Sequence, residues 1–186
     1  MPTLANPVTL TKQIAASSDD VNEEGTDFRW TDKTVWVGTG GSAAASYTGL
    51  RFTSISIPKG ATIVSAHLEV YSSKGQWIAV SFQIAAEATD AFGGSLTFTS
   101  ASRPSQRLLT SAKINHSSNV KWNGATWYSL DEMASVIQEA VNRPSWQSGN
   151  SLAIVLKGTG SAFGRKFVRS FDQSASLAPK LVVTYR

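Results

Sequence analysis

Cysteine is absent from the 186-residue sequence, which excludes disulfide bonds, thiolate zinc sites and cysteine nucleophiles. Charged residues are also scarce, at 16% of the chain, which argues against a coiled coil or a disordered tail. No apolar run approaches the roughly 18 residues that a membrane-spanning helix needs. The first ten residues lack the basic start and apolar core of a secretory signal, so we expect none. The composition predicts a single domain over residues 1–186.

Charge is unevenly distributed along the chain, whose formal net charge is +4. Residues 1–32 carry two basic and six acidic side chains, a balance of −4, and the rest of the chain carries +8. One interpretation is an ordinary, uneven surface. The other is a basic surface that docks on an acidic particle, on an anionic polysaccharide or on the acidic segment of another copy. The candidate docking residues are Lys157, Arg165, Lys166 and Arg169. Basic residues are otherwise scattered and no recognition motif is present, so we expect no nucleic-acid partner.

Most of the chain alternates apolar and polar side chains with a period of two, as strands with one buried face do. Two such runs, Leu50–Ile57 and Thr62–Tyr71, flank the turn Pro58–Gly60 and predict an antiparallel hairpin, with a bulge where the parity slips. The polar stretch from Phe92 to Asn119 predicts a surface excursion with one short strand. Further strands are expected near residues 8–15, 34–37, 78–85, 152–156, 166–171 and 181–185.

One helix is predicted, over Leu130–Asn142, where apolar residues follow a helical stripe that Arg143 and Pro144 end. Ser129 and Glu132 have the S-x-x-E spacing of a capping box. We expect the stripe to pack against a sheet edge. Together these patterns predict an all-β fold, an antiparallel two-sheet β-sandwich with one short α-helix.

The segment Gly49–Tyr71, GLRFTSISIPKGATIVSAHLEVY, resembles a known family. An LRF-type strand that runs into IP-x-GA-x-I is typical of DNRLRE-type jelly-roll modules. These are relatives of carbohydrate-binding modules, found in secreted bacterial proteins and in some tailed-phage structural proteins. Later segments resemble the same family in order, namely Val120–Trp122 with Trp127, Glu132–Trp146, Gly149–Leu156, Ser170–Asp172 and Ala178–Tyr185. The family usually has Glu where this chain has Asp172. The resemblance implies a jelly-roll topology.

Six tryptophans is a high number for this length, and aromatic side chains are suited to stacking on sugar rings. We expect the tryptophans in the family-like segments, Trp122, Trp127 and Trp146, to pack in the core. Trp30, Trp36 and Trp77 are the candidates for glycan stacking. Trp36 is expected to point away from its neighbours Val35 and Val37.

Jelly-roll modules of the resembled family often hold a structural calcium ion where their first and last strands meet. An acidic run follows the first expected strand here, and Asp172 precedes the last. Calcium takes about six to eight oxygen ligands, which such a cluster can supply. The candidate ligands are Asp19, Asp20, Glu23, Glu24 and Asp172; the other interpretation of the run is a solvated loop. No other cofactor is expected.

The sequence offers no arrangement of catalytic residues. We expect His67, on the polar face of a strand, and His116, in a polar loop, to be ordinary surface histidines. The two acids at the helix start are explained by capping, and nothing places Glu87 opposite another acid, as a glycosidase would require. Glycine clusters at residues 38–41 and 158–164 lack the lysine and helix of a phosphate loop. We expect no enzyme activity.

Two classes of function remain. The first is a non-catalytic virion protein, of the capsid decoration or tail accessory type, which binds other virion proteins or copies of itself. The alternative is a carbohydrate-binding module of a secreted or cell-surface protein, extracellular and bound to a polysaccharide. No membrane partner is expected. Residues 1–7 form a predicted N-terminal arm, because Pro2 and Pro7 disfavour strand pairing. The arm either attaches to a neighbouring subunit or is a frayed terminus.

Overall fold

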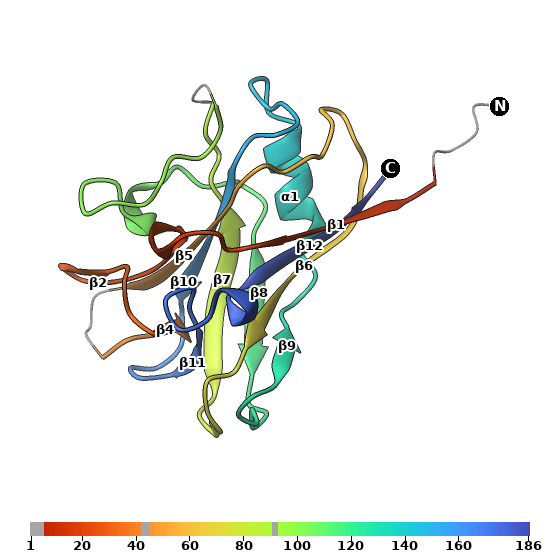
Figure 1. Cartoon of the computed structure of the whole chain (residues 1–186). Coiled ribbons are helices and arrows are strands. Elements are labelled where there is room, and N and C mark those ends of the chain that lie inside the picture. Colours follow the sequence, from red (N-terminus) through yellow and green to blue (C-terminus); the bar gives the residue numbers. More distant parts are fainter. Residues whose placement is uncertain (1–5, 42–44, 91–92) are drawn as a thin grey trace.

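A computed structural model describes residues 6–41, 45–90 and 93–186, and its described strands form three antiparallel groups (Figure 1). The four-stranded sheet has the order β1 (Val8–Gln13), β12 (Lys180–Tyr185), β6 (Ile63–Tyr71) and β9 (Trp127–Ser129). The six-stranded sheet has the order β3 (Asp27–Arg29), β2 (Asp20–Glu24), β5 (Ser46–Phe52), β10 (Leu152–Gly158), β7 (Val80–Ala86) and β8 (Ile114–Ser118). β11 (Arg165–Arg169) pairs with β4 (Thr34–Gly38). Most of the predicted N-terminal arm, residues 1–5, lies outside the described residues.

The two larger sheets pack face to face, which confirms the predicted antiparallel sandwich with one short helix. Alternate residues of each sheet fill the space between them, with Phe52 and Phe82 from one sheet and Leu68 from the other fully buried. The helix α1 (Ala134–Val141) contacts β6 and β7 and buries its apolar stripe there. The stripe was predicted to pack against a sheet edge, but β6 and β7 are inner strands of their sheets, so the stripe is part of the main core instead.

The chain passes from one sheet to the other between consecutive strands, from β5 to β6 and then to β7, as in a jelly roll. The predicted hairpin of residues 50–71 is therefore wrong. β5 ends at Phe52, and Ser54 has a left-handed φ of 55° that turns the chain out of the sheet. Ile55 and Ile57 are then buried between the sheets rather than within one of them.

The capping box predicted for the helix is also wrong. The helix begins at Ala134, and Ser129 instead pairs with Glu69 in the ladder between β6 and β9. The Glu132 carboxylate accepts hydrogen bonds from the backbone N–H of Ala66 and of Ala134. It thus fixes the helix start to β6 as well as satisfying one free N–H of the helix.

The outer face of the six-stranded sheet is covered by the predicted excursion, which contains the short strand β8 as expected. Phe98 is buried there against Val21 and Ala153. Gly49 makes this approach possible, because a Cβ at that position would lie 2.7 Å from the Phe98 ring. The sheet is therefore buried on both faces near β2 and β5.

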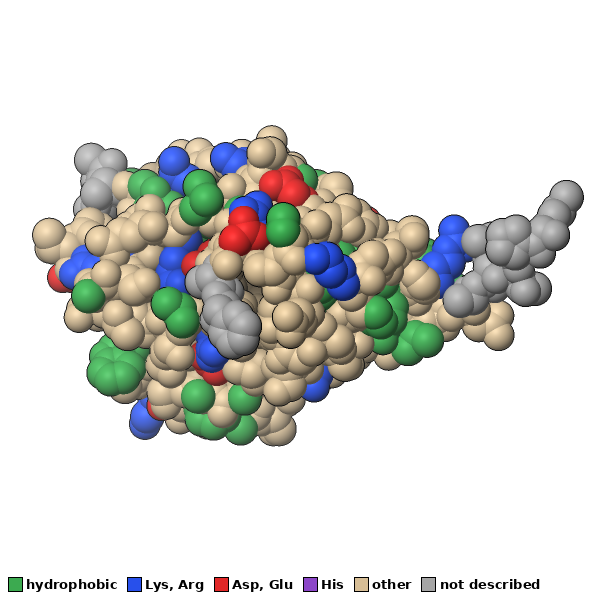
Figure 2. Space-filling view, turned by 90° about the horizontal axis from the view of Figure 1, so that it is seen from above, with side chains coloured by type: hydrophobic (Ala, Val, Ile, Leu, Met, Phe, Trp, Pro, Cys, Tyr) green, Lys and Arg blue, Asp and Glu red, His purple; other side chains and the backbone are tan. Residues whose placement is uncertain are grey.

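The molecule tapers toward its termini, where β1, β12 and β6 extend beyond the body of the sandwich (Figures 1 and 2). β1 is an edge strand of the four-stranded sheet. At the opposite end lie β4 and β11 (Figure 1). Within the described ranges, no helix has the length and apolarity required to cross a bilayer.

Candidate functional site

The candidate site is an open groove at the β4–β11 end, which we call the aromatic groove. Its volume is about 320 Å³, and it is lined by Lys74, Gly75, Gln76, Trp77, Ile78, Phe163, Arg165 and Phe167. One wall is the segment before β7, and the other is the loop after β10 with the start of β11. A groove of this size, formed between sequence-distant segments, suits a binding site.

Gln76 holds the two walls together. Its side-chain amide donates to the backbone carbonyl of Phe167 at 2.9 Å and accepts from the Phe167 N–H. Its backbone forms both hydrogen bonds of an antiparallel bridge with Trp122. Gln76 is buried and fully engaged, whereas the side chains of the next two residues, Trp77 and Ile78, are exposed.

Exposed apolar side chains surround the groove. Val120 does not line the groove, but it is exposed on the segment that pairs with Gln76 through Trp122. The exposed fractions are 74% for Trp77, 48% for Ile78, 63% for Val120 and 56% for Phe163. The three of these side chains that line the groove, Trp77, Ile78 and Phe163, depart from the isolated exposed apolar residues that are normal on protein surfaces.

A cation lies over each aromatic ring of the groove. The Lys121 ammonium is 4.4 Å from the centre of the Trp77 ring, and the Lys74 ammonium is 4.7 Å from that of Phe167. The Arg165 guanidinium lies 5.4 Å from the Phe163 ring centre. These are cation–π distances, so the rings hold the cations at the rim of the groove.

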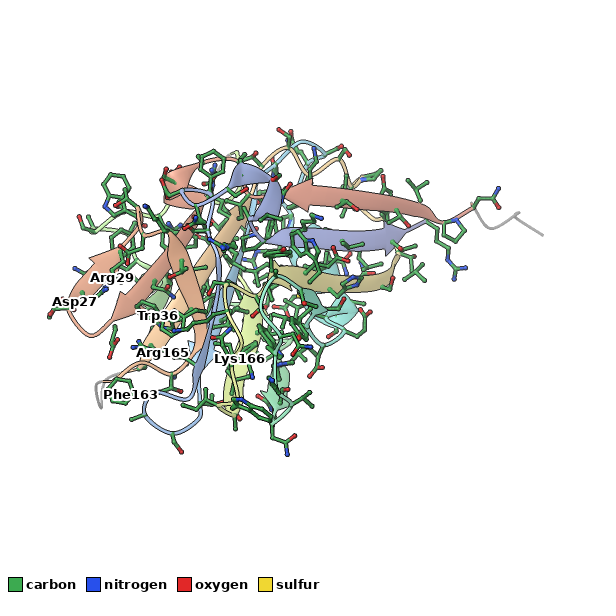
Figure 3. The ribbon with its side chains drawn as sticks, turned by 60° about the horizontal axis from the view of Figure 1, so that its bottom comes forward. Asp27, Arg29, Trp36, Phe163, Arg165 and Lys166 are labelled. Atoms are coloured by element: carbon green, nitrogen blue, oxygen red, sulfur yellow. The ribbon has the colours of Figure 1, made fainter. Side chains whose placement is uncertain are left out.

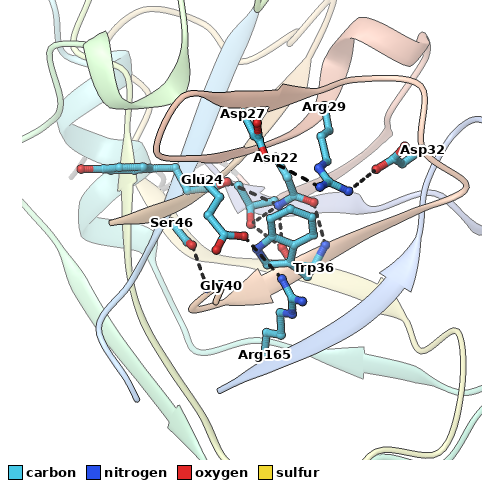
Figure 4. Close-up of polar contacts among 11 residues, drawn as sticks. Asn22, Glu24, Asp27, Arg29, Asp32, Trp36, Gly40, Ser46 and Arg165 are labelled. Carbon is cyan, nitrogen blue, oxygen red and sulfur yellow. Dashed lines mark hydrogen bonds and ion pairs between the residues drawn. The ribbon is translucent and has the colours of Figure 1, made fainter. Parts of the chain in front are cut away.

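Arg165 is the most constrained of these cations. Its guanidinium lies 4.9 Å from the ring centre of Trp36 and 3.6 Å from the Glu24 carboxylate. Figure 4 draws Arg29 above and Arg165 below the Trp36 ring, and Figure 3 shows Arg165 between Trp36 and Phe163. Trp36 thus forms the base on which the arginine rests.

Phe163 is held in an unfavourable backbone conformation, with a φ of 59°. Bulky residues rarely adopt this left-handed region, where a residue other than glycine costs about 1–3 kcal/mol. The strain accompanies an exposed ring at the groove, and strained residues often mark functional positions.

We expect Phe163→Gly to leave the free energy of unfolding unchanged or to raise it by up to about 1 kcal/mol, because glycine adopts positive φ without strain. The same variant should weaken binding at the groove, because the exposed ring is lost. Denaturant unfolding and binding assays check the two effects separately. Phe163→Leu is the matched control, since it removes the ring but keeps the strain. A loss of more than about 1 kcal/mol in Phe163→Gly would show that the ring is structural.

The three tryptophans predicted to stack on glycans have different surroundings. Trp77 lies in the aromatic groove. Trp30, 51% exposed, lines a separate pocket of about 170 Å³ with Phe28 and Phe98. Trp36 points away from the core valines as expected, but it is buried beneath Arg29 and Arg165 and cannot stack on a ligand. That candidate was wrong because arginines from neighbouring strands cover it.

The predicted basic docking patch is not formed as expected, because Lys166 is fully buried. Its ammonium donates to the backbone carbonyls of Val120 at 2.9 Å and Gln76 at 3.3 Å, and burial lowers its pKa. Only Arg165 of the predicted set lines the groove, whereas Arg169 follows on the same face of β11 and Lys157 is exposed on β10. In Figure 2 the lysines and arginines are spread over the face rather than gathered.

The predicted acidic loop is a buried strand of the six-stranded sheet, β2, preceded by a turn. Asp19 binds Arg51 at 2.9 Å, and Glu23 accepts hydrogen bonds from the backbone and hydroxyl of Ser105. With Glu24 paired to Arg165, most of the acidic N-terminal charge is engaged within the chain. It is therefore not free to pair with another copy.

Asp20 is 2% exposed, and one of its carboxylate oxygens accepts the Phe171 N–H at 2.7 Å while the other is buried without a partner. Desolvation raises its pKa to about 8, and the nearby Asp172 and Asp19 add to the rise. Asp172 itself accepts a hydrogen bond from Ser17. Among the described residues, no three His, Asp or Glu side chains gather to hold a metal ion, so the predicted calcium cluster is not assembled.

The histidines and remaining acids have structural partners. The prediction for His116 was wrong, because it is buried in β8, stacked on Phe82, with Nδ1 3.2 Å from Asp131. His67 lies beside Glu69, on the same strand. The buried Glu87 pairs with Arg107 at 2.8 Å.

No protein-family model matches the chain, and no curated protein matches it significantly.

Most residues of the aromatic groove were not predicted from the sequence. Trp77 was selected because aromatic side chains suit sugar stacking, but Phe163 falls in a glycine cluster that was considered only as a phosphate loop. Lys74, Lys121 and Val120 gave no signal, because their position depends on the bridge between Gln76 and Trp122.

Proposed function

We propose that this protein is a non-catalytic binding protein that attaches to a larger particle through the aromatic groove. This is the role expected of a virion-associated protein of the capsid decoration or tail accessory type, located on the virion. One observation carries the proposal: Trp77, Ile78 and Phe163 are exposed together around one open groove.

The residue types at the groove suit a protein interface. Aromatic residues and arginine are enriched at the centres of interfaces, where a few such side chains contribute most of the binding free energy. The exposed aliphatic side chains Ile78 and Val120 extend this apolar surface beyond the rings. Burying them on a partner would remove apolar surface from water.

The sequence and the remaining side chains support the non-catalytic part of the proposal. The resemblance of residues 49–185 to jelly-roll modules includes tailed-phage structural proteins. The carboxylates weighed as a glycosidase pair are engaged elsewhere, Glu87 with Arg107 and Asp131 with His116. Asp90, in turn, pairs with Arg143.

A second candidate function, a carbohydrate-binding module, is favoured by one observation. The Trp77 indole is 74% exposed at the edge of the groove, where a sugar ring could contact it. The localisation would then be extracellular.

The two functions separate in a parallel binding assay of the full chain on purified tailed-phage particles and on a glycan array. We expect saturable binding to a particle, and we expect Trp77→Ala to weaken it about 30-fold, as removal of an interface hot spot does. Binding to glycans alone, lost in Trp77→Ala, would support the second function. Particle binding that Trp77→Ala leaves unchanged would contradict the proposed role of the groove.

A further inference from the structure

We infer that the partner presents to the aromatic groove an acidic protein segment that carries one aromatic or large aliphatic side chain. This inference rests on the proposed function and specifies its partner. It follows from the charge, the ring geometry and the size of the groove.

The charge of the groove is of one sign. Lys74 and Arg165 line it, Lys121 lies at its rim, and its described lining contains no acidic residue. Glu24 approaches Arg165 beside Trp36, and Glu24 itself does not line the groove. Glu24 already compensates Arg165, but a partner that buries Lys74 and Lys121 must compensate these two charges, because an unpaired charge at an interface core is costly.

The positions of the cations favour carboxylates over sugar rings. A sugar stacks on the face of an aromatic ring, but the Trp77 and Phe167 rings already have the Lys121 and Lys74 ammonium groups over them. These ammonium groups are in turn held where they can donate to an incoming carboxylate. On those ring faces a neutral glycan would have to displace the lysines, whereas an acidic segment would bind them.

The size of the groove and its flanks favour a protein segment. About 320 Å³ lies at the lower end of ligand pockets and has room for one large side chain. The exposed Ile78 and Val120 beside it match apolar side chains rather than the hydroxyl groups of a polysaccharide. The geometry therefore indicates one apolar anchor with carboxylates on both sides.

Short peptides test this directly with the full chain. The probe is the capped pentapeptide Glu-Glu-Phe-Glu-Glu, titrated into isotopically labelled protein while amide NMR shifts are recorded. We expect shifts at residues 74–78 and 163–167. Affinity should be about tenfold weaker when Ser replaces the Phe, and binding should be lost when Lys replaces every Glu. Oligogalacturonate, an anionic sugar, is titrated in parallel.

A charge-reversed variant supplies the protein side of the test. The double variant Lys74→Glu with Lys121→Glu should have an affinity for the acidic peptide that is lower by about tenfold or more, and it should bind the lysine peptide. The control combines Lys59→Glu with Lys113→Glu, two exposed lysines outside the groove, and should leave the affinity unchanged.

Three results would overturn the inference: no shifts at the groove with the acidic peptide, equal affinity for both peptide charges, or tighter binding of oligogalacturonate there. The proposed function fails separately. It would be lost if the chain bound glycans alone, or if Trp77→Ala left particle binding unchanged, whatever the peptides do.

Discussion

Asn22→Ala should lower the free energy of unfolding by about 3 kcal/mol, a large fraction of the stability of a domain. Asn22 is buried in β2, and its side chain bonds both backbone groups of Trp36, accepting from the N–H at 2.8 Å and donating to the carbonyl at 2.9 Å. It also donates to the Thr48 hydroxyl at 3.1 Å. The substitution leaves the Trp36 N–H buried without this partner and creates a cavity.

The effect should extend to the site, because Asn22 ties β4 to the six-stranded sheet and Trp36 supports Arg165. Urea unfolding of the wild type and variant measures the difference. Asn115→Ala, in which the exposed residue loses one hydrogen bond from Gln83, is the control and should change stability by less than about 0.5 kcal/mol. A loss below about 1 kcal/mol in Asn22→Ala would show that the network contributes little.

Asp20→Asn is expected to stabilise the protein, by an amount that grows with pH. The pKa of Asp20 is raised from 3.8 to about 8 in the fold, so between these values the native state binds a proton that the unfolded state does not. The contribution of Asp20 to the free energy of unfolding is fully present below about pH 4. It falls by about 1.4 kcal/mol for each pH unit above that, until the pH reaches about 8. Asparagine has no charge to desolvate and removes this loss.

The difference in the free energy of unfolding between Asp20→Asn and the wild type should increase by about 3 kcal/mol from pH 5 to pH 7. Unfolding curves at matched pH values measure it. Asp27→Asn, at an exposed position, is the control and should show no such widening. If the free energy of unfolding of Asp20→Asn changed with pH as that of the wild type does, the Asp20 carboxyl would have to be ionised in the folded protein, with water or an ion reaching it.

The sandwich could be predicted from the sequence because alternation reports directly on which face of a strand is buried. β6, with Ala66, Leu68 and Val70 inward, and β12 were found in this way. Alternation does not report which strands pair. The hairpin prediction failed because one residue, Ser54, directs the chain to the other sheet.

β2 was missed because its acidic composition is typical of a solvated loop. Its polar side chains are buried by partners far away in sequence, such as Ser105 for Glu23. Lys166 was misplaced for the same reason. A buried lysine requires carbonyl acceptors, here those of Gln76 and Val120, that no local pattern reveals.

The candidate site was predictable only in part. Composition drew attention to the tryptophans, but their exposure differs, since Trp77 is 74% exposed and Trp36 is buried beneath two arginines. The strained φ of Phe163 is a property of the folded chain. The cations over the rings likewise come from three segments, around Lys74, Lys121 and Arg165, that only the fold brings together.

The most direct test of the aromatic groove as the docking site compares two tryptophans on one partner. Both Trp77 and Trp30 are at least half exposed, but only Trp77 lies in the groove. The dissociation constant of the complex with the particle is measured for the Trp77→Ala and Trp30→Ala variants. The account predicts a value about 30-fold above wild type for Trp77→Ala and an unchanged value for Trp30→Ala. Equal effects of the two substitutions, or a larger effect of Trp30→Ala, would contradict it.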